Sequence, residues 1–238
     1  MKTSNRFAIC ILSPLLLASI ALGQQDYVGR YDVYGGFMYL DSPGLSLGEK
    51  GFHTQIGLNP AKWYSLGFDF STGTGDTTLT PSMLKSSIAQ QIGAALAPLI
   101  AAGALPSNYS PVVPEHSTTQ TYAAGPQLNY RHFRWVTLSI HPSVGAIHEE
   151  ATPIVAKLDP IETLLVSQLA PSGKLQQWVG FYGVGGAIDF NVSQHFGLRV
   201  TTDLVHDHLF ASLVNTRNTV RFSVGPTFHM GKNVAAQK

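Results

Sequence analysis

The 238-residue sequence carries little charge, since Asp, Glu, Lys and Arg together make up 12% of it, about half the usual fraction. The basic and acidic residues nearly cancel, at 15 and 14, and no basic patch is interleaved with aromatic residues. These absences exclude the electrostatic footprint of a nucleic-acid-binding protein. The low charge, together with 23 glycines and 10% aromatic residues, also differs from the composition of a disordered chain.

Cysteine is almost absent as well. The only one, Cys10, lies in the apolar run Phe7–Ile20, which follows two basic residues and precedes a small-x-small cleavage site ending at Gly23. This run is short for a membrane-spanning helix and contains Pro14, which disfavours an uncleaved membrane helix. We therefore predict a secretory signal peptide over residues 1–23, and no disulfide bond in the exported chain.

Apolar and polar residues alternate through much of the remaining chain. In KWYSLGFDFS, the even positions from Tyr64 to Phe70 are all large and apolar, whereas the odd positions that follow Tyr64 are polar or glycine. A period of two indicates a β-strand with one apolar face. The pattern predicts eight strands, over residues 31–39, 52–58, 62–71, 121–130, 136–144, 178–190, 196–204 and 220–228.

The connections between these strands alternate between short and long. Short turns follow the second, fourth and sixth strands, and the largest of the intervening loops span residues 73–117 and 148–175. A soluble sandwich or lipocalin-like barrel has little reason to place its long loops at one end, and its bulky residues would point inward. A barrel in the outer membrane has short turns, long external loops and an apolar outer band. The sequence therefore predicts an all-β fold, an eight-stranded antiparallel up-and-down transmembrane β-barrel.

The strands resemble those of the OmpA/OmpX-like family of small outer-membrane β-barrels. The resemblance is carried by YDVYGGFMYL, KWYSLGFDFS, YAAGPQLNY and FSVGPTFHM, and it covers nearly all of Arg30–Gly231. It implies a bacterial outer-membrane location, with lipopolysaccharide, phospholipid and the barrel-insertion machinery as partners, rather than a specific activity. We place the barrel domain at residues 24–231 and a C-terminal tail at 232–238, without a peptidoglycan-binding domain.

Charged residues on the polar face of the strands predict how the lumen is filled. A barrel of eight strands has room only for side chains or one small ligand, which disfavours a general diffusion porin. We expect Asp203 to pair with Arg221 nearly opposite it, and Asp189 with Arg199 diagonally across a turn, with Asp69 also facing inward. Paired charges of this kind make a closed lumen, and a gated ion path is the alternative.

The two longest loops each contain a predicted helix. Thr80 and Asp159 are capping residues followed by proline at the first helical position, and Glu162 adds a capping box to the second helix. Both helices carry an apolar stripe, formed in the first by Ile88, Ile92, Leu96 and Leu99 and in the second by Ile161, Leu164, Leu165 and Leu169. We expect the stripes to pack on each other over the barrel mouth, as a cap that offers a surface to an unidentified extracellular ligand.

Two polar clusters lie where strands are expected to emerge at the rim. They are His206-Asp207-His208 and His148-Glu149-Glu150, whose side chains suit transition metals although their spacing is not metal-specific. His206, Asp207 and Ser212 also contain the groups of an acyl-transfer triad, on sequence proximity alone. We interpret these residues as solvated rim groups and predict no metal, cofactor or catalytic site. A structural or surface-interaction role is favoured, with a narrow channel and a lipid-modifying enzyme as alternatives.

Overall fold

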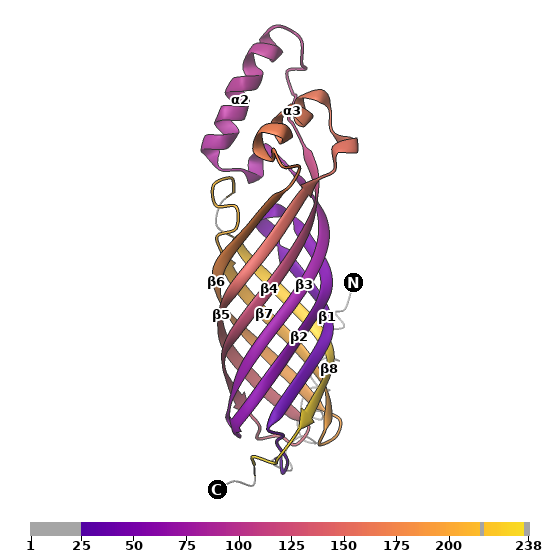
Figure 1. Ribbon diagram of the computed structural model, residues 1–238, viewed down its shortest axis with the longest axis vertical. Coiled ribbons are helices and arrows are strands. Elements are labelled where there is room, and N and C mark those ends of the chain that lie inside the picture. Colours follow the sequence, from indigo (N-terminus) through magenta and orange to yellow (C-terminus); the bar gives the residue numbers. More distant parts are fainter. Residues whose placement is uncertain (1–24, 215–216, 236–238) are drawn as a thin grey trace, which may run out of the picture.

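The computed structural model describes residues 25–214 and 217–235, so the predicted signal peptide lies outside the described residues. The chain forms a closed barrel in which eight antiparallel strands follow one another in chain order (Figure 1). The strands are β1 Tyr31–Ser42, β2 Leu47–Ala61, β3 Tyr64–Leu79, β4 Val113–Tyr130, β5 Val136–Pro153, β6 Leu175–Asn191, β7 Phe196–Asp207 and β8 Arg217–Met230. β1 pairs with β8 along its length, which closes the barrel and confirms the predicted architecture.

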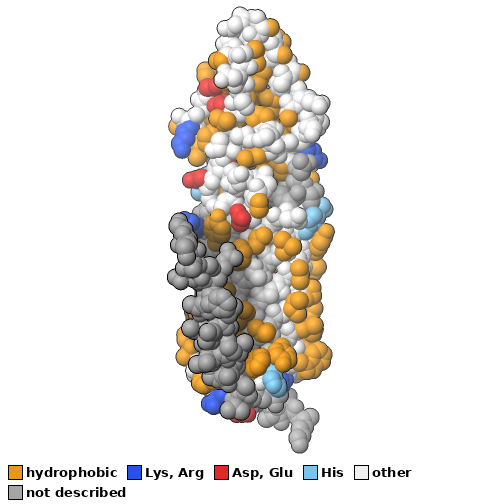
Figure 2. All heavy atoms as spheres, turned by 180° about the vertical axis from the view of Figure 1, so that it is seen from behind, with side chains coloured by type: hydrophobic (Ala, Val, Ile, Leu, Met, Phe, Trp, Pro, Cys, Tyr) orange, Lys and Arg blue, Asp and Glu red, His pale blue; other side chains and the backbone are white. Residues whose placement is uncertain are grey.

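The alternation of apolar and polar residues in the sequence corresponds to side chains that face out of and into the barrel. Along β7, exposed and buried residues alternate almost without exception, with Leu198 and Val200 outward and Arg199 and Asp203 inward. The other strands also point aromatic and aliphatic side chains outward, and Figure 2 shows these side chains along the barrel wall, with charged groups gathered toward the two ends. An apolar exterior around a polar interior is the arrangement that lipid on the outside requires.

Several strands are longer than predicted. β3 to β6 have 16, 18, 18 and 17 residues, whereas about 9 to 11 suffice to cross a bilayer. The sequence boundaries were wrong here because the extra segments are rich in Thr, Ser and Glu and lose their apolar face, although the backbone ladder continues from Gly73 to Leu79. The barrel therefore extends past its apolar belt at the end that carries the long loops, here called the loop end.

The two largest loops carry the helices, drawn above the barrel in Figure 1. α2 spans Ser86–Ala101 and α3 spans Pro160–Leu169, each preceded by a short 3-10 turn, η2 Pro81–Met83 and η3 Val155–Lys157. Thr80 precedes η2 and makes no side-chain capping bond, so the first helix begins later than predicted. Within residues 25–214 and 217–235, no helix is both long and apolar enough to cross a membrane.

An apolar cluster fills the barrel mouth at the loop end, and we call it the mouth cluster. Its buried members are Leu45, Leu47, Leu84 and Val214, and Leu79, Met83, Ile88, Ile92, Phe210 and Leu213 pack against it. These residues come from the loops after β1, β3 and β7, from the adjoining ends of β2 and β3, and from the first turns of α2. Burying these residues together holds three separate loops against the barrel, because each loop removes apolar surface from water.

Candidate functional site

The lumen is organised around Arg221, which projects inward from β8. Its guanidinium donates to Asp203 at 3.0 Å, to Asp69 at 2.8 and 3.2 Å, and to the Ser71 hydroxyl at 3.0 Å. Asp203 is its cross-strand neighbour on β7, whereas Asp69 reaches it across the lumen from β3. The pairing expected from the sequence is thus present, and Arg221 also bridges two carboxylates from opposite parts of the wall.

A second pair lies nearer the end with the short turns, here called the turn end. Arg199 donates to both carboxylate oxygens of Asp189, at 2.6 and 2.8 Å, and to Gln55 Oε1 at 2.5 Å. The two partners are directly opposite in the β6–β7 ladder rather than diagonal as expected, because the short connection from Asn191 to Phe196 sets the register. A bidentate guanidinium–carboxylate pair fixes both side chains and is among the stronger hydrogen-bonded arrangements.

Two histidines complete the charge network, and the sequence analysis gave neither of them a role there. His53 Nε2 hydrogen-bonds Asp69 while its Nδ1 lies 2.7 Å from the Ser223 hydroxyl. His141 Nε2 lies 2.7 Å from the second oxygen of Asp203. Both histidines occupy the polar phase of their strands, so the alternation alone could have placed them inside the barrel. Each carboxylate beside Arg221 therefore has both an arginine and a histidine partner.

Large side chains also fill the lumen. Tyr34 and Met38 point inward from β1 and are almost completely buried, although the sequence pattern had assigned the bulky residues to the outer face. The Tyr34 hydroxyl donates to Ser223 at 2.8 Å, and the Arg199 guanidinium lies 5.7 Å from the centre of its ring. A cavity between Asp69, His141 and Arg221 has a volume of only ≈ 10 Å³. That space is at the lower limit for a single water molecule.

The first turns of α2 pack on the barrel mouth. Ile88 and Ile92 of α2 pack against the mouth cluster, and the extensive contacts of α2 are with η2. Leu96 is buried, and Ile161 and Leu165 of α3 are half-buried. The Leu164 side chain, which we expected in the packed stripe, is 57% exposed. Mutual packing of the two stripes stays a prediction.

α3 faces the mouth cluster through Leu169 of the predicted stripe and through Val166. Val166 and Leu169 line a cavity of ≈ 70 Å³ whose opposite wall includes Leu45, Leu84 and Phe210. α3 starts at the predicted capping box. In that box, Asp159 accepts from Glu162 N at 2.7 Å, and Glu162 accepts from Asp159 N at 2.9 Å.

Asp159 also accepts a hydrogen bond from Tyr109 at 2.6 Å. The hydrogen bond from the Glu162 backbone and that from Tyr109 hold the pKa of Asp159 below its usual range. Burial and the adjacent carboxylate raise the pKa of Tyr109, so its phenol stays protonated as the donor. These contacts connect the start of α3 to the segment that returns from α2.

The two polar rim clusters are divided by the strand alternation. His206 lies outside the wall, 2.7 Å from Asn218 Oδ1, whereas Asp207 points inward and is buried. His148 packs against the Trp178 ring outside, whereas Glu149 is buried inside. Successive side chains on a strand face opposite ways, so neither cluster converges on one ion or one substrate. In the described part of the chain, no group of three His, Cys, Asp or Glu residues has the geometry to hold a metal.

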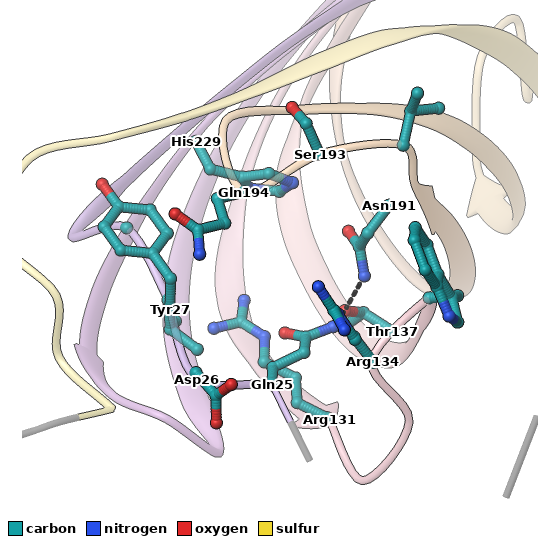
Figure 3. Close-up of a pocket in the computed structure, with 14 residues that line it drawn as sticks. Gln25, Asp26, Tyr27, Arg131, Arg134, Thr137, Asn191, Ser193, Gln194 and His229 are labelled. Atoms are coloured by element: carbon teal, nitrogen blue, oxygen red, sulfur yellow. Dashed lines mark hydrogen bonds between the residues drawn. The ribbon is translucent and has the colours of Figure 1, made fainter. Parts of the chain in front are cut away.

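A polar pocket of ≈ 290 Å³ lies at the turn end (Figure 3). It is enclosed by the chain before β1, the β4–β5 turn and the β6–β7 turn. Its floor contains Thr137, whose hydroxyl accepts from Gln25 at 2.8 Å and from Asn191 at 3.3 Å. Arg131 and His229 also line it, and both contact Asp32. Arg131 falls in the short turn that the sequence predicts after its fourth strand, and nothing in the sequence pattern indicated this pocket.

The segment before β1 is fixed across the turn end. Val28 N donates to Asn233 Oδ1 at 2.9 Å, and Val28 O accepts from Val234 N at 2.9 Å. Asn59 Nδ2 donates to Gly29 O at 2.8 Å and to Asp32 Oδ2 at 2.7 Å. These bonds join the two ends of the described chain and hold the wall of the pocket.

No protein-family model matches the sequence. No curated protein matches it either. Among solved structures, Neisserial surface protein A (NspA) is 9% identical over 85% of this chain and 99% of its own, with a TM-score of 0.51. Ail of Yersinia pestis, solved with the heparin analogue sucrose octasulfate, is 12% identical over 84% and 98%, with a TM-score of 0.44. OprG of Pseudomonas aeruginosa is 9% identical over 88% and 99%, also with a TM-score of 0.44.

Sequence identities this low support a statement about the fold alone, and that statement rests on the likeness to NspA. That likeness agrees with the closed barrel, the apolar outer wall and the polar lumen described above. In fold, this chain is a small eight-stranded outer-membrane β-barrel.

Proposed function

We propose that this barrel has a structural or surface-interaction role in the outer membrane, and that its lumen does not conduct ions. The observation that carries the proposal is the bonded network across the lumen, in which Arg221 connects β8 to Asp203 on β7 and to Asp69 on β3. An ion could pass only if these bonds opened, which would leave charges buried without partners. Such an opening is costly in a narrow lumen.

Recording from single proteins in planar bilayers tests this proposal. The folded wild-type barrel should show no steady conductance, whereas Arg221→Ala combined with Asp203→Ala should open a leak by removing two of the side chains that fill the lumen. Val155→Ala, a change outside the barrel wall, is the matched control and should stay silent. Steady ion-selective conductance by the wild type would favour the narrow channel instead.

The surface role is supported by the loop end. Apolar side chains on and beside its helices remain exposed, and they are Leu99, Val155, Leu164 and Leu169. Exposed apolar groups concentrated on one end of a molecule are typical of contact with another protein or with lipid. Replacing all four by serine should abolish binding to an extracellular ligand while leaving the heat-modifiable gel mobility of the barrel unchanged.

The proposal includes the remaining expectations from the sequence. Residues 1–23 are removed on export, residues 24–231 insert through the barrel-insertion machinery, and lipopolysaccharide and phospholipid surround the wall. The barrel has no catalytic role, and the absence of fatty-acid release from lipopolysaccharide by the purified protein would support this. Release of fatty acid that is lost in His206→Ala would instead favour a lipid-modifying enzyme.

A further inference from the structure

The pocket at the turn end contains a buried arginine whose hydrogen-bonding capacity is only partly used. Arg131 is 6% exposed, and its Nη2 makes only long contacts, 3.5 Å to Asp32 and 3.3 Å to Asn59. Its Nη1 is buried and has no hydrogen-bond partner among the described residues. A buried guanidinium nitrogen without a partner is costly, so its presence calls for a group that the protein itself does not supply.

Asp32 does not fill the hydrogen-bonding positions of the pocket. Its carboxylate is already hydrogen-bonded by His229 Nδ1 at 2.6 Å and by Asn59 Nδ2 at 2.7 Å. His229 Nε2, on the other side of the ring, is buried and without a partner among the described residues. The carboxylate is therefore well satisfied while the cationic and imidazole groups around it retain free positions.

Further donors surround the same space. Figure 3 shows the guanidinium groups of Arg131 and Arg134 on either side of the Gln25 amide, with Gln194 above them. Arg134 is exposed at the rim, where its guanidinium lies 5.2 Å from the centre of the Trp135 ring. Asp26 is the one carboxylate among the residues that line the pocket, and it is exposed. The lining thus offers two guanidinium groups and several amides.

From this arrangement, we propose that the turn-end pocket binds a small oxyanion, a phosphate or a carboxylate, between Arg131 and Arg134. Guanidinium groups match both anions because their N–H donors lie in one plane and can bond two oxygens at once. The volume of ≈ 290 Å³ suits a small anion or the charged end of a longer molecule. The inference does not depend on whether the lumen conducts ions, because the pocket lies at the turn end, outside the paired charges of the lumen.

Trp135 lines the pocket and provides the measurement. The chain has three tryptophans, so Trp63→Phe with Trp178→Phe leaves Trp135 as the single reporter. The folded protein in detergent micelles is titrated with inorganic phosphate and, separately, with acetate, each against chloride at constant ionic strength. We expect a saturable fluorescence change whose midpoint gives the affinity. Saturation by phosphate alone supports a phosphate ligand, and saturation by both supports a ligand with a carboxylate.

Three variants decide whether the named residues form the site. Arg134→Gln removes a rim charge, and Arg131→Lys keeps the charge but loses the planar donors. Each change should raise the midpoint concentration about tenfold, which corresponds to the loss of one charge-assisted hydrogen bond. Lys62→Gln removes a charge from the β2–β3 turn, which does not line the pocket, and should leave the midpoint unchanged. Heat-modifiable gel mobility checks that each variant is folded. No saturable response to either anion, or equal midpoints in Arg134→Gln and the wild type, would overturn the proposal.

Discussion

Replacing Arg221 by methionine tests whether the charge network holds the barrel together. Among the described residues, the change removes the one guanidinium bonded to Asp69 and Asp203, so these two buried carboxylates keep His53 and His141 as their ionisable partners there. Removing one member of a buried ion pair costs about 3 to 5 kcal/mol because a charge stays buried without compensation. We expect a loss of stability in this range, larger than that of Asp203→Asn, after which Arg221 still bonds Asp69.

A more specific expectation concerns the double variant, in which Arg221→Met is combined with Asp203→Asn. Once Arg221 is gone, Asp203→Asn removes a charge that has lost its main partner, so the two losses should not add. The coupling free energy should lie between about 0.5 and 3 kcal/mol, the range for residues in contact. Urea unfolding in phospholipid vesicles, followed by tryptophan fluorescence and by gel mobility without boiling, measures each free energy of unfolding.

A second double-mutant cycle, on Asp189 and Arg221, serves as the control. Asp189 bonds Arg199 and shares no hydrogen-bond partner with Arg221 in the described structure. Asp189→Asn and Arg221→Met should therefore add within about 0.5 kcal/mol. Additive losses for Asp203 and Arg221, or equal coupling in both cycles, would refute the view that Arg221 acts through direct pairing.

Three further expectations concern the wall and the loop end. Val200→Arg on the 40%-exposed outer face of β7 should cost about 2 to 4 kcal/mol in vesicles, whereas Val155→Arg, at a 60%-exposed site outside the wall, should cost far less; equal losses would reverse the lipid-facing assignment. The lowered pKa of Asp159 means that its capping contribution is complete above its unfolded pKa of about 4 and is lost as the pH falls through the folded value. Amide exchange in α3 should accordingly quicken in acid, and Asp159→Ala should remove this pH dependence and cost about 1 kcal/mol of local stability. Cysteines at Ile92 and Leu213, which both pack on the mouth cluster, should crosslink readily in intact cells, and lipid-probe labelling of both without a crosslink would place α2 in the outer leaflet.

The sequence alone predicted the features that depend on neighbouring residues. The period of two in KWYSLGFDFS separated the outer and inner faces, and short turns alternating with long loops indicated an up-and-down barrel. The capping box of Asp159 and Glu162 also needs only a three-residue spacing, and the structure contains it. Each of these signals is local, so it can be recognised before any strand has found its partner.

Contacts between distant strands were decided only by the tertiary structure. Barrel closure brings Asp69 to Arg221, 152 residues away, and packing over the mouth turns Val166 rather than Leu164 toward the barrel. Arg131, in the short turn after β4, is buried because the segment before β1 crosses the turn end and Asp32 lies beside it, 99 residues away in the chain. Strand register and loop packing set these contacts, and both depend on the whole closed sheet rather than on any one stretch of residues.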